Sequence, residues 1–339
     1  MRRRLTAAAV AVGLTLAALP ALAEVEPGSD PSPTGSEARA LALLERAAQA
    51  GRRLTYSGTQ YDAQWRQDST TSEVVELRHD PVRGSVMTGA GVDAGPAAPT
   101  AVLDPRLLTR MAAEYTLEIT GPGRCTGRSA SIVDARRPDG RLAGRFWVDR
   151  TSGVLLRREV FDAEGRRVRS SAFVDLDITA GARPSAPALM VAARRGVERP
   201  APEAVQRLRN RGWHVPEDLP QGFRLFETRR NGEVLHLAYT DGLSTLSLFA
   251  QGGELGSAPV EGFSAEQVEG RPVWVRRAAP ERVVWSGGDR VWTLVSDAPE
   301  DAVRAAVAAL PRDKAPDTGL SARLGRGLSR LGGMLNPFD

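Results

Sequence analysis

The sequence contains little cysteine, little lysine and few aromatic residues, and each shortage excludes a class of protein. The single cysteine, Cys125, has no partner within the chain, so an intramolecular disulfide cannot hold the fold together. Lys314 is the one lysine among 45 basic residues, and 41 acidic residues nearly balance them, which argues against nucleic acid as the main partner. Aromatic residues make up only 5% of the chain, so we expect core packing for most of them, with a hydrophobic pocket as the alternative.

Long hydrophobic runs are also scarce, and the one that stands out is Leu5–Leu19. It follows Arg2, Arg3 and Arg4 and precedes Ala21-Leu22-Ala23, an order typical of a secretory signal peptide. Its 15 residues fall short of the roughly 20 that a membrane-spanning helix needs. The sequence therefore predicts export to the periplasm or the extracytoplasmic face of the cell envelope, with cleavage after Ala23 and no transmembrane anchor.

Length and composition predict two folded domains, because 339 residues exceed the usual 100 to 200 residues or so of one domain. Stretches rich in proline, glycine and serine mark a tether after the signal peptide and a linker near the middle of the chain. The expected division is a signal peptide (1–23), a flexible tether (24–36), a large domain (37–180), a linker (181–204), a small domain (205–311) and a tail (312–339).

The periodicity of apolar residues predicts an α+β fold that is mostly antiparallel β-sheet. Apolar spacing over 37–51 and 103–113 predicts two amphipathic helices, and 89–100 is expected to be a loop. Strand-like runs separated by glycine-bearing turns predict an antiparallel meander within 129–178. Further strands are expected at 54–61, 72–79, 115–119, 223–228, 234–240, 243–250, 272–276, 283–286 and 291–296.

One more helix is expected near the end of the small domain. Asp297 and Glu300 have the spacing of a capping box, in which Asp297 would cap the first turn. The apolar residues that follow have helical spacing and predict one face buried against the sheet. They are Val303, Ala306, Val307 and Leu310.

A search for catalytic, metal or cofactor motifs returns none. The three histidines, His79, His214 and His236, form no H-E-x-x-H motif, and paired cysteines are absent, so a zinc site is unsupported. Nucleotide-binding glycine patterns do not occur in the required strand-to-helix context. The sequence therefore predicts no enzyme, cofactor or metal site, and the open alternative is a hydrolase, tested most simply at Ser57 and His236.

Four segments in a fixed order resemble one known family. They are the helix-to-strand segment Leu41–Thr59, the meander Phe146–Gly165 with its W-x-D-x-x-S-G-type pattern, the segment Trp213–Phe223 with W-x-x-P-x-x-L-P-x-G-F-type spacing, and the hairpin Tyr239–Leu248. Together they resemble the RseB/MucB family of periplasmic negative regulators of the sigma-E stress response. The arginine-rich composition is more like an actinobacterial member.

The resemblance implies both a fold and a function. The fold would be a large half-barrel like LolA and LppX with helices on its concave face, followed by a smaller sheet-plus-helix domain. The function would be binding of the extracytoplasmic part of a membrane anti-sigma factor, which shields that factor from proteolysis until a lipid-like signal releases it. The family's pattern implies no cofactor and no catalysis. The loop expected at 89–100 departs from the family, which has a strand-rich stretch there.

Two sets of site residues follow, one for each function that we consider. A regulator would contact its partner through the two motifs of the small domain, although Trp213 and Phe223 could equally close its core. These candidate partner-binding residues are Trp213, Leu219, Pro220, Phe223, Tyr239, Asp241 and Gly242. A lipid or lipoprotein carrier would instead hold an acyl chain in an apolar cavity of the large domain. Its candidate lining residues, which are equally good core residues, are Leu41, Leu44, Tyr56, Leu117, Phe146 and Leu155.

The tail has a leucine-rich helical face that the resemblance does not cover. This face, opposite arginines, is typical of a helix that lies on a membrane surface or docks on a partner. Four glycines weaken the helix, so a frayed tail or a helix packed on its own domain stays an alternative. The leucines are Leu320, Leu324, Leu328, Leu331 and Leu335.

Overall fold

The computed structural model describes residues 35–66, 69–82, 84–89, 92–96, 103–179, 201–255, 261–277 and 280–312. The expected signal peptide and the leucine face of the tail lie outside these residues, as do most of the tether and the linker. The predicted domain boundaries stay predictions.

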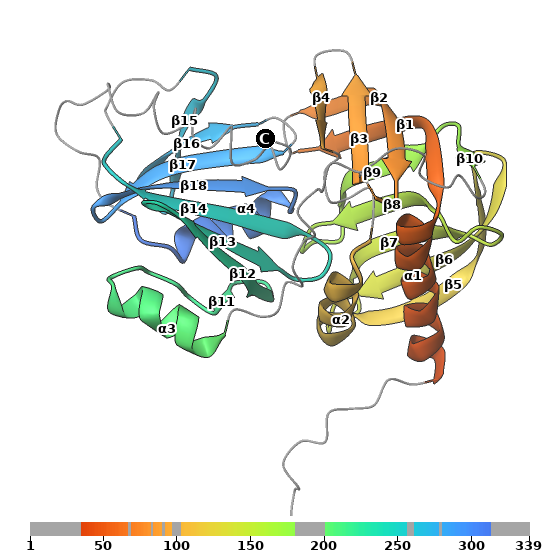
Figure 1. The fold of residues 1–339 in the computed structure, drawn as a ribbon, viewed down its shortest axis with the longest axis horizontal. Helices are drawn as coiled ribbons and strands as arrows, with labels where there is room; N and C mark the ends of the chain where they lie inside the picture. The colour runs from red at the N-terminus through yellow and green to blue at the C-terminus, as the bar shows by residue number, and fades with distance from the viewer. Residues whose placement is uncertain are drawn as a thin grey trace, which may run out of the picture. The chain divides into compact units, whose positions relative to one another are not determined.

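A large antiparallel sheet occupies the first half of the described chain (Figure 1). Nine of its ten strands lie in the order β4-β3-β2-β1-β9-β8-β7-β6-β5, and the tenth, β10, pairs with β1. The pairing of β1 with β9 joins the two ends of this half of the chain. The strands are β1 (Thr55–Trp65), β2 (Thr70–Asp80), β3 (Gly84–Gly89), β4 (Val92–Pro96), β5 (Thr116–Cys125), β6 (Arg128–Arg136), β7 (Leu142–Asp149), β8 (Leu155–Phe161), β9 (Arg167–Phe173) and β10 (Asp177–Thr179).

The predicted meander is confirmed as β6 to β9, in which each strand pairs with the next. Tight turns join these strands because glycine takes backbone angles that other residues adopt only with strain. Gly140 between β6 and β7 has φ +83°, and Gly165 between β8 and β9 has φ +79°. The N–H groups of these glycines donate to the carbonyls of Arg137 and Asp162, which closes each turn.

Two helices cover one face of the large sheet, which we call the helix-covered face. They are α1 (Gly35–Arg53) and α2 (Pro105–Glu114), as the apolar spacing predicts. Leu44 of α1 and Met111 of α2 are fully buried in one cluster with Val133, Phe146 and Leu117 of the strands. The helix-covered face therefore carries the hydrophobic core of this half of the chain.

A smaller antiparallel sheet of eight strands follows (Figure 1). Its strands lie in the order β11-β12-β13-β14-β18-β17-β16-β15. They are β11 (Asp218–Leu219), β12 (Phe223–Asn231), β13 (Val234–Thr240), β14 (Thr245–Gly252), β15 (Ser264–Val268), β16 (Arg271–Arg276), β17 (Glu281–Gly287) and β18 (Arg290–Ser296). Helices α3 (Pro202–Asn210) and α4 (Glu300–Ala308) share one core cluster with these strands. Both sheets belong to one compact unit of the chain, Thr34–Asp339.

The predicted fold class is confirmed, since antiparallel strands with few helices make up the described chain. The loop expected at 89–100 is wrong in part, because β4 occupies Val92–Pro96 and pairs with β3. Ala and Gly in this stretch hide the strand, since their strand propensity is low and the pairing with β3 decides the conformation. Strands β3, β11 and β15 and helix α3 were also not predicted, and α3 begins inside the expected linker.

The last helix is confirmed, but its predicted cap is wrong. Helix α4 begins after Pro299, and no side chain caps its first turn. Asp297 Oδ1 instead accepts a hydrogen bond of 2.7 Å from the backbone N–H of Thr245, at the start of β14. A tertiary contact has therefore taken the side chain that local spacing assigns to the helix. The buried face is as predicted, with Val303, Ala306, Val307 and Leu310 all in the core.

Candidate functional site

The Asp-Gly turn between β13 and β14, predicted to contact a partner, packs against the helix-covered face of the large sheet. Asp241 Oδ2 accepts a hydrogen bond of 2.8 Å from the hydroxyl of Tyr115. Asp241 Oδ1 accepts from the backbone N–H groups of Leu243 at 2.8 Å and Ser244 at 2.6 Å. Burial raises the pKa of Asp241, and these three hydrogen bonds act in the opposite direction. The carboxylate thus holds the turn closed and attaches it to the segment between α2 and β5.

Gly242 approaches a helix so closely that a side chain there would not fit. It has φ +94°, and a β-carbon would overlap the backbone nitrogen of Met111 in α2. The next residue, Leu243, lies in the same core cluster as Leu44 and Phe146. The carbonyl of Leu243 also accepts a hydrogen bond from Arg158 Nη2 of β8. The turn is therefore an internal contact of this chain, and its side chains are buried.

The other predicted partner-binding residues differ in exposure. Leu219 and Phe223 are buried in the core of the small sheet. Pro220 is exposed, and Trp213 is half-buried beneath the guanidinium of Arg290, which lies 4.4 Å from the ring centre. Tyr239 is fully buried and donates a hydrogen bond of 2.9 Å to the carbonyl of Pro216. Partner contact by this set stays a prediction, with Pro220 and Trp213 as its accessible members.

The predicted apolar lining of a lipid cavity lies in packed cores. Five of its residues belong to or pack against the cluster beneath α1 and α2, and they are Leu41, Leu44, Leu117, Phe146 and Leu155. Tyr56 stacks on His79 with ring centres 4.6 Å apart, in a neighbouring cluster. None of the six lines the cavity beside β9. Acyl-chain binding by these residues stays a prediction, and it requires the core beneath the helices to open.

Part of the helix-covered face is polar, which the sequence analysis missed. Residues directly opposite each other in a sheet share a face, and the register aligns Phe146, Arg158, Ser171 and Asp62 across β7, β8, β9 and β1. Arg158, Ser171 and Asp62 are all buried. A signal was present in β8, where Arg158 stands between the apolar residues Leu156 and Val160 at the two-residue period of a strand. The helix-covered face therefore carries buried polar side chains as well as the apolar core.

Arg169 continues this polar region on β9 and borders a cavity of about 800 Å³. It lies two residues before Ser171 and so on the same face. Its exposed fraction is 9%, and its Nε and Nη1 atoms are buried without a hydrogen-bond partner among the described residues. The cavity is lined by the ends of β1 and β9 and by the segment that leads into α4. Its volume is in the usual range for a ligand site.

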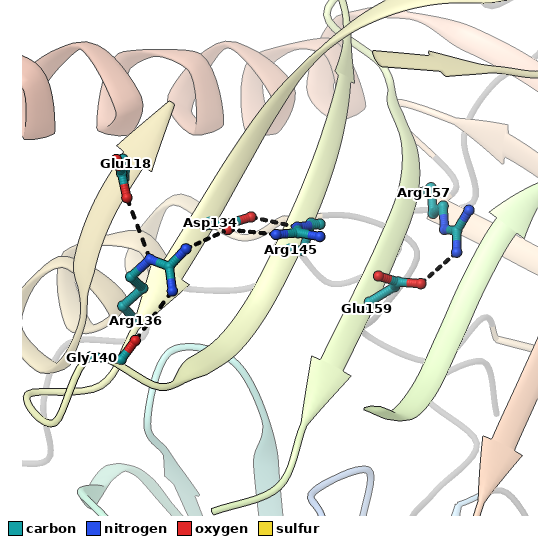
Figure 2. A network of polar contacts seen from close by, with 7 residues as sticks. All are labelled: Glu118, Asp134, Arg136, Gly140, Arg145, Arg157 and Glu159. Atoms are coloured by element: carbon teal, nitrogen blue, oxygen red, sulfur yellow. Dashed lines mark hydrogen bonds and ion pairs between the residues drawn. The ribbon is translucent and has the colours of Figure 1, made fainter. Parts of the chain in front are cut away.

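The opposite face of the large sheet carries a ladder of paired charges (Figure 2). Successive register pairs align Glu118, Asp134, Arg145 and Glu159 across β5 to β8. Asp134 is fully buried, and both of its oxygens accept from Arg145, at 2.6 and 2.7 Å. This hydrogen bonding raises the pKa of Arg145. Arg136 bridges Asp134 and Glu118 at 3.2 and 3.3 Å. Each charge here has a partner within the chain, so the ladder stabilises the sheet.

The residues of the hydrolase alternative do not meet in one sheet. Ser57 lies on β1 of the large sheet, and His236 lies on β13 of the small sheet, stacked on Phe249 at 4.5 Å. Burial lowers the pKa of His236 to about 4, with a smaller contribution from Arg229. Cys125 is half-buried, and its thiol donates to the carbonyls of Leu156 and Phe173 at 3.6 and 3.7 Å. Burial also raises the pKa of that thiol, which lowers its reactivity.

No group of three or more His, Cys, Asp or Glu side chains among the described residues could hold a metal ion. None of the helices in the described ranges is both long enough and apolar enough to cross a membrane.

Comparison with known proteins identifies a family domain in this chain. The family model of the MucB/RseB N-terminal domain matches residues 86–194, which include the meander β6 to β9. The chain carries a domain of the MucB/RseB family. The predicted RseB/MucB membership is confirmed for these residues. No curated protein matches the chain.

Solved structures show similarity over longer stretches. MucB in complex with MucA(peri) is 22% identical, covering 81% of this chain and 99% of that one, with a TM-score of 0.43. The Pseudomonas aeruginosa MucA/MucB complex is 22% identical, covering 82% of this chain and all of that one, also with a TM-score of 0.43. The Mycobacterium tuberculosis lipoprotein LppX is 13% identical, covering 42% of this chain and 95% of that one, with a TM-score of 0.26.

Proposed function

We propose that this chain is an exported negative regulator of a sigma-E type stress response. In this role it binds the extracytoplasmic part of a membrane anti-sigma factor. The match of residues 86–194 to the MucB/RseB domain carries the proposal. The motifs Trp213–Phe223 and Tyr239–Leu248, which lie beyond the matched residues, add support from the second half of the chain. MucB itself has been solved in complex with MucA(peri).

The proposal includes protection of the bound partner from proteolysis. A protein that covers an extended segment keeps a protease from reaching its backbone, because cleavage requires the segment to enter the protease active site in an accessible form. The mature chain should therefore slow cleavage of the anti-sigma factor in proportion to the fraction bound.

Capture from an envelope extract tests the binding role. The mature chain, residues 24–339, is immobilised, and the retained proteins and lipids are identified by mass spectrometry. Retention of a single-span anti-sigma factor, with slower digestion of that factor by an envelope protease when this chain is added, is the expected result. An unrelated exported protein on the same support is the control. Recovery of lipid or lipoprotein alone would contradict the regulator and favour the carrier.

Release by a lipid-like signal is the remaining part of the proposal. It would require the apolar core beneath α1 and α2, including Leu44 and Phe146, to admit an acyl chain. Replacement of Leu44 by tryptophan should then block release by lipid vesicles without blocking capture of the partner. Unchanged release by vesicles would contradict lipid entry at this core.

A further inference from the structure

We infer that the cavity beside β9 binds an acidic side chain of a partner peptide, whose carboxylate pairs with Arg169. The inference deepens the proposed function and rests on it for the source of the peptide. The residues that carry it are on the cavity wall, and neither the motif resemblance nor the family domain assigns them a role.

The first argument is the state of Arg169. A buried guanidinium stays charged, because the pKa of arginine is too high for it to lose its proton in a protein. A buried charge without a partner is costly, and buried charges in proteins are accordingly paired. Arg169 is nine-tenths buried, with Nε and Nη1 unpartnered among the described residues. Arg169 also lines the cavity, so its guanidinium is the buried charge placed to pair with an incoming anion.

The second argument comes from the charges around Arg169. Six arginines line the cavity, and Arg169 is the one without a carboxylate partner in the described chain. Arg169 is therefore the arginine of this wall that is left to pair with an incoming carboxylate. The five pairs are Arg66 with Glu281 at 2.8 Å, Arg166 with Asp162 at 2.8 Å, Arg167 with Glu159 at 2.8 Å, Arg277 with Glu300 at 3.1 Å, and Arg304 with Glu266 at 3.6 Å.

The third argument favours a peptide over a phosphate group as the ligand of this cavity. Asp301 also lines the cavity, and its Oδ1 atom is buried without a hydrogen-bond partner. A ligand that offers a donor as well as an acceptor therefore suits a wall that carries both Asp301 and Arg169. A peptide offers both, since its backbone N–H groups donate and an Asp or Glu side chain accepts. A phosphate group offers acceptors and carries up to two negative charges, so Asp297 and Asp301 on the wall would repel it more strongly than a singly charged carboxylate.

Selection from a random dodecapeptide library displayed on phage tests the inference with the full mature chain. Peptides that bind are expected to be enriched in Asp or Glu. The strongest peptide is then synthesised with its acidic residue intact and with that residue replaced by the matching amide, and the affinities of both are measured. The acidic form should bind the wild-type chain at least about tenfold more tightly than the amide form.

The variant Arg169→Gln locates the interaction. It should bind both peptides with the same reduced affinity, because the carboxylate and the guanidinium act on each other and their losses do not add. Arg167→Gln is the matched control, since Arg167 lines the same cavity but already pairs with Glu159 and stacks on Trp65 at 4.3 Å. The assignment to Arg169 would be overturned if the affinity losses from the amide peptide and from Arg169→Gln were additive. It would also be overturned if Arg167→Gln lost as much affinity as Arg169→Gln. The amide peptide on wild-type protein keeps the test valid even if the variant folds poorly.

Two further measurements distinguish the ways in which the inference can fail. Binding of phosphatidylglycerol vesicles that depends on Arg169, without selection of acidic peptides, would overturn the peptide and assign the cavity to a lipid headgroup. Capture from envelope extract by both wild type and Arg169→Gln would overturn the inference and leave the proposed function standing. Selection of acidic peptides by wild type, lost in Arg169→Gln, without capture of an anti-sigma factor would support the site and overturn the proposed function.

Discussion

The hydroxyl of Tyr115 donates a hydrogen bond of 2.8 Å to Oδ2 of Asp241, and this bond joins residues 126 positions apart in the chain. Burial raises the pKa of both groups, because the charged form of each is unfavourable away from water. The bond links the segment before β5 in the large sheet to the turn after β13 in the small sheet.

Removal of the Tyr115 hydroxyl should destabilise the fold. In Tyr115→Phe, Asp241 keeps its two backbone donors but loses the third, so a buried carboxylate oxygen is left without its partner. The free energy of unfolding should fall by about 1 to 3 kcal/mol, measured by urea denaturation. Tyr61→Phe on β1, where the side chain is 41% exposed, is the control and should change stability by less than about 0.5 kcal/mol. Equal losses in the two variants would contradict the role of the bond.

Alanine at Gly242 should disrupt the packing of the turn on α2. Gly242→Ala forces a β-carbon into the backbone of Met111 at φ +94°. Gly140→Ala is the matched control, because Gly140 has φ +83° and open space around it. The control should lose about 1 kcal/mol from backbone strain alone, and Gly242→Ala at least about 2 kcal/mol more. A difference near zero between their thermal unfolding midpoints would mean that α2 moves away without cost.

Loss of Asp134 should weaken the charge ladder on the outer sheet face (Figure 2). Asp134→Ala leaves Arg145 without its two charge-assisted hydrogen bonds, and the free energy of unfolding should fall by about 2 kcal/mol or more. Glu164→Ala removes an exposed pair with Arg166 at 2.9 Å and should cost less than about 0.5 kcal/mol. Guanidinium denaturation distinguishes the two, and similar losses would contradict a stabilising ladder.

The protein should lose stability in mild acid through His236. Burial, together with Arg229 directly opposite in the register, lowers the pKa of His236 to about 4. The unfolded chain, with a histidine pKa of about 6.5, then binds a proton that the folded chain does not. The stability from His236 is therefore complete above pH 6.5 and is lost as the pH falls towards 4, by up to about 3 kcal/mol.

The variant His236→Phe checks this prediction, since phenylalanine preserves the stacking on Phe249 and cannot be protonated. Urea denaturation at several values between pH 7 and pH 4 should show a shallower loss of stability for the variant than for wild type. Parallel slopes would mean that other groups, and not His236, account for the acid sensitivity.

The local pattern of residues predicts much of this fold. The meander β6 to β9 follows from alternating strands and glycine turns, and the buried face of α4 follows from helical spacing. Each pattern lies within a short stretch, where backbone preference and side-chain period agree. β4 escapes prediction because its small residues have low strand propensity, and its pairing with β3 forms the strand.

The candidate site depends on contacts between distant stretches, so it is predicted less well. Asp241 and Gly242 have the composition of an exposed hairpin turn, and only the approach of Met111 and Tyr115 makes them internal. Asp297 has the spacing of a helix cap, but Thr245 takes its carboxylate. The sequence around Arg169 is typical of a strand residue that faces solvent. Only the packing around β9 buries Arg169 beside a cavity.

The sequence by itself determined the class of fold, the positions of most strands along the chain and the family of the matched domain, because these depend on periodicity and motifs within continuous segments. The tertiary structure decided which polar residues lose contact with water, because burial depends on which distant segments pack together. That is why Arg158, Arg169 and Asp241, whose letters are ordinary for a strand or a turn, become buried charged groups that require partners.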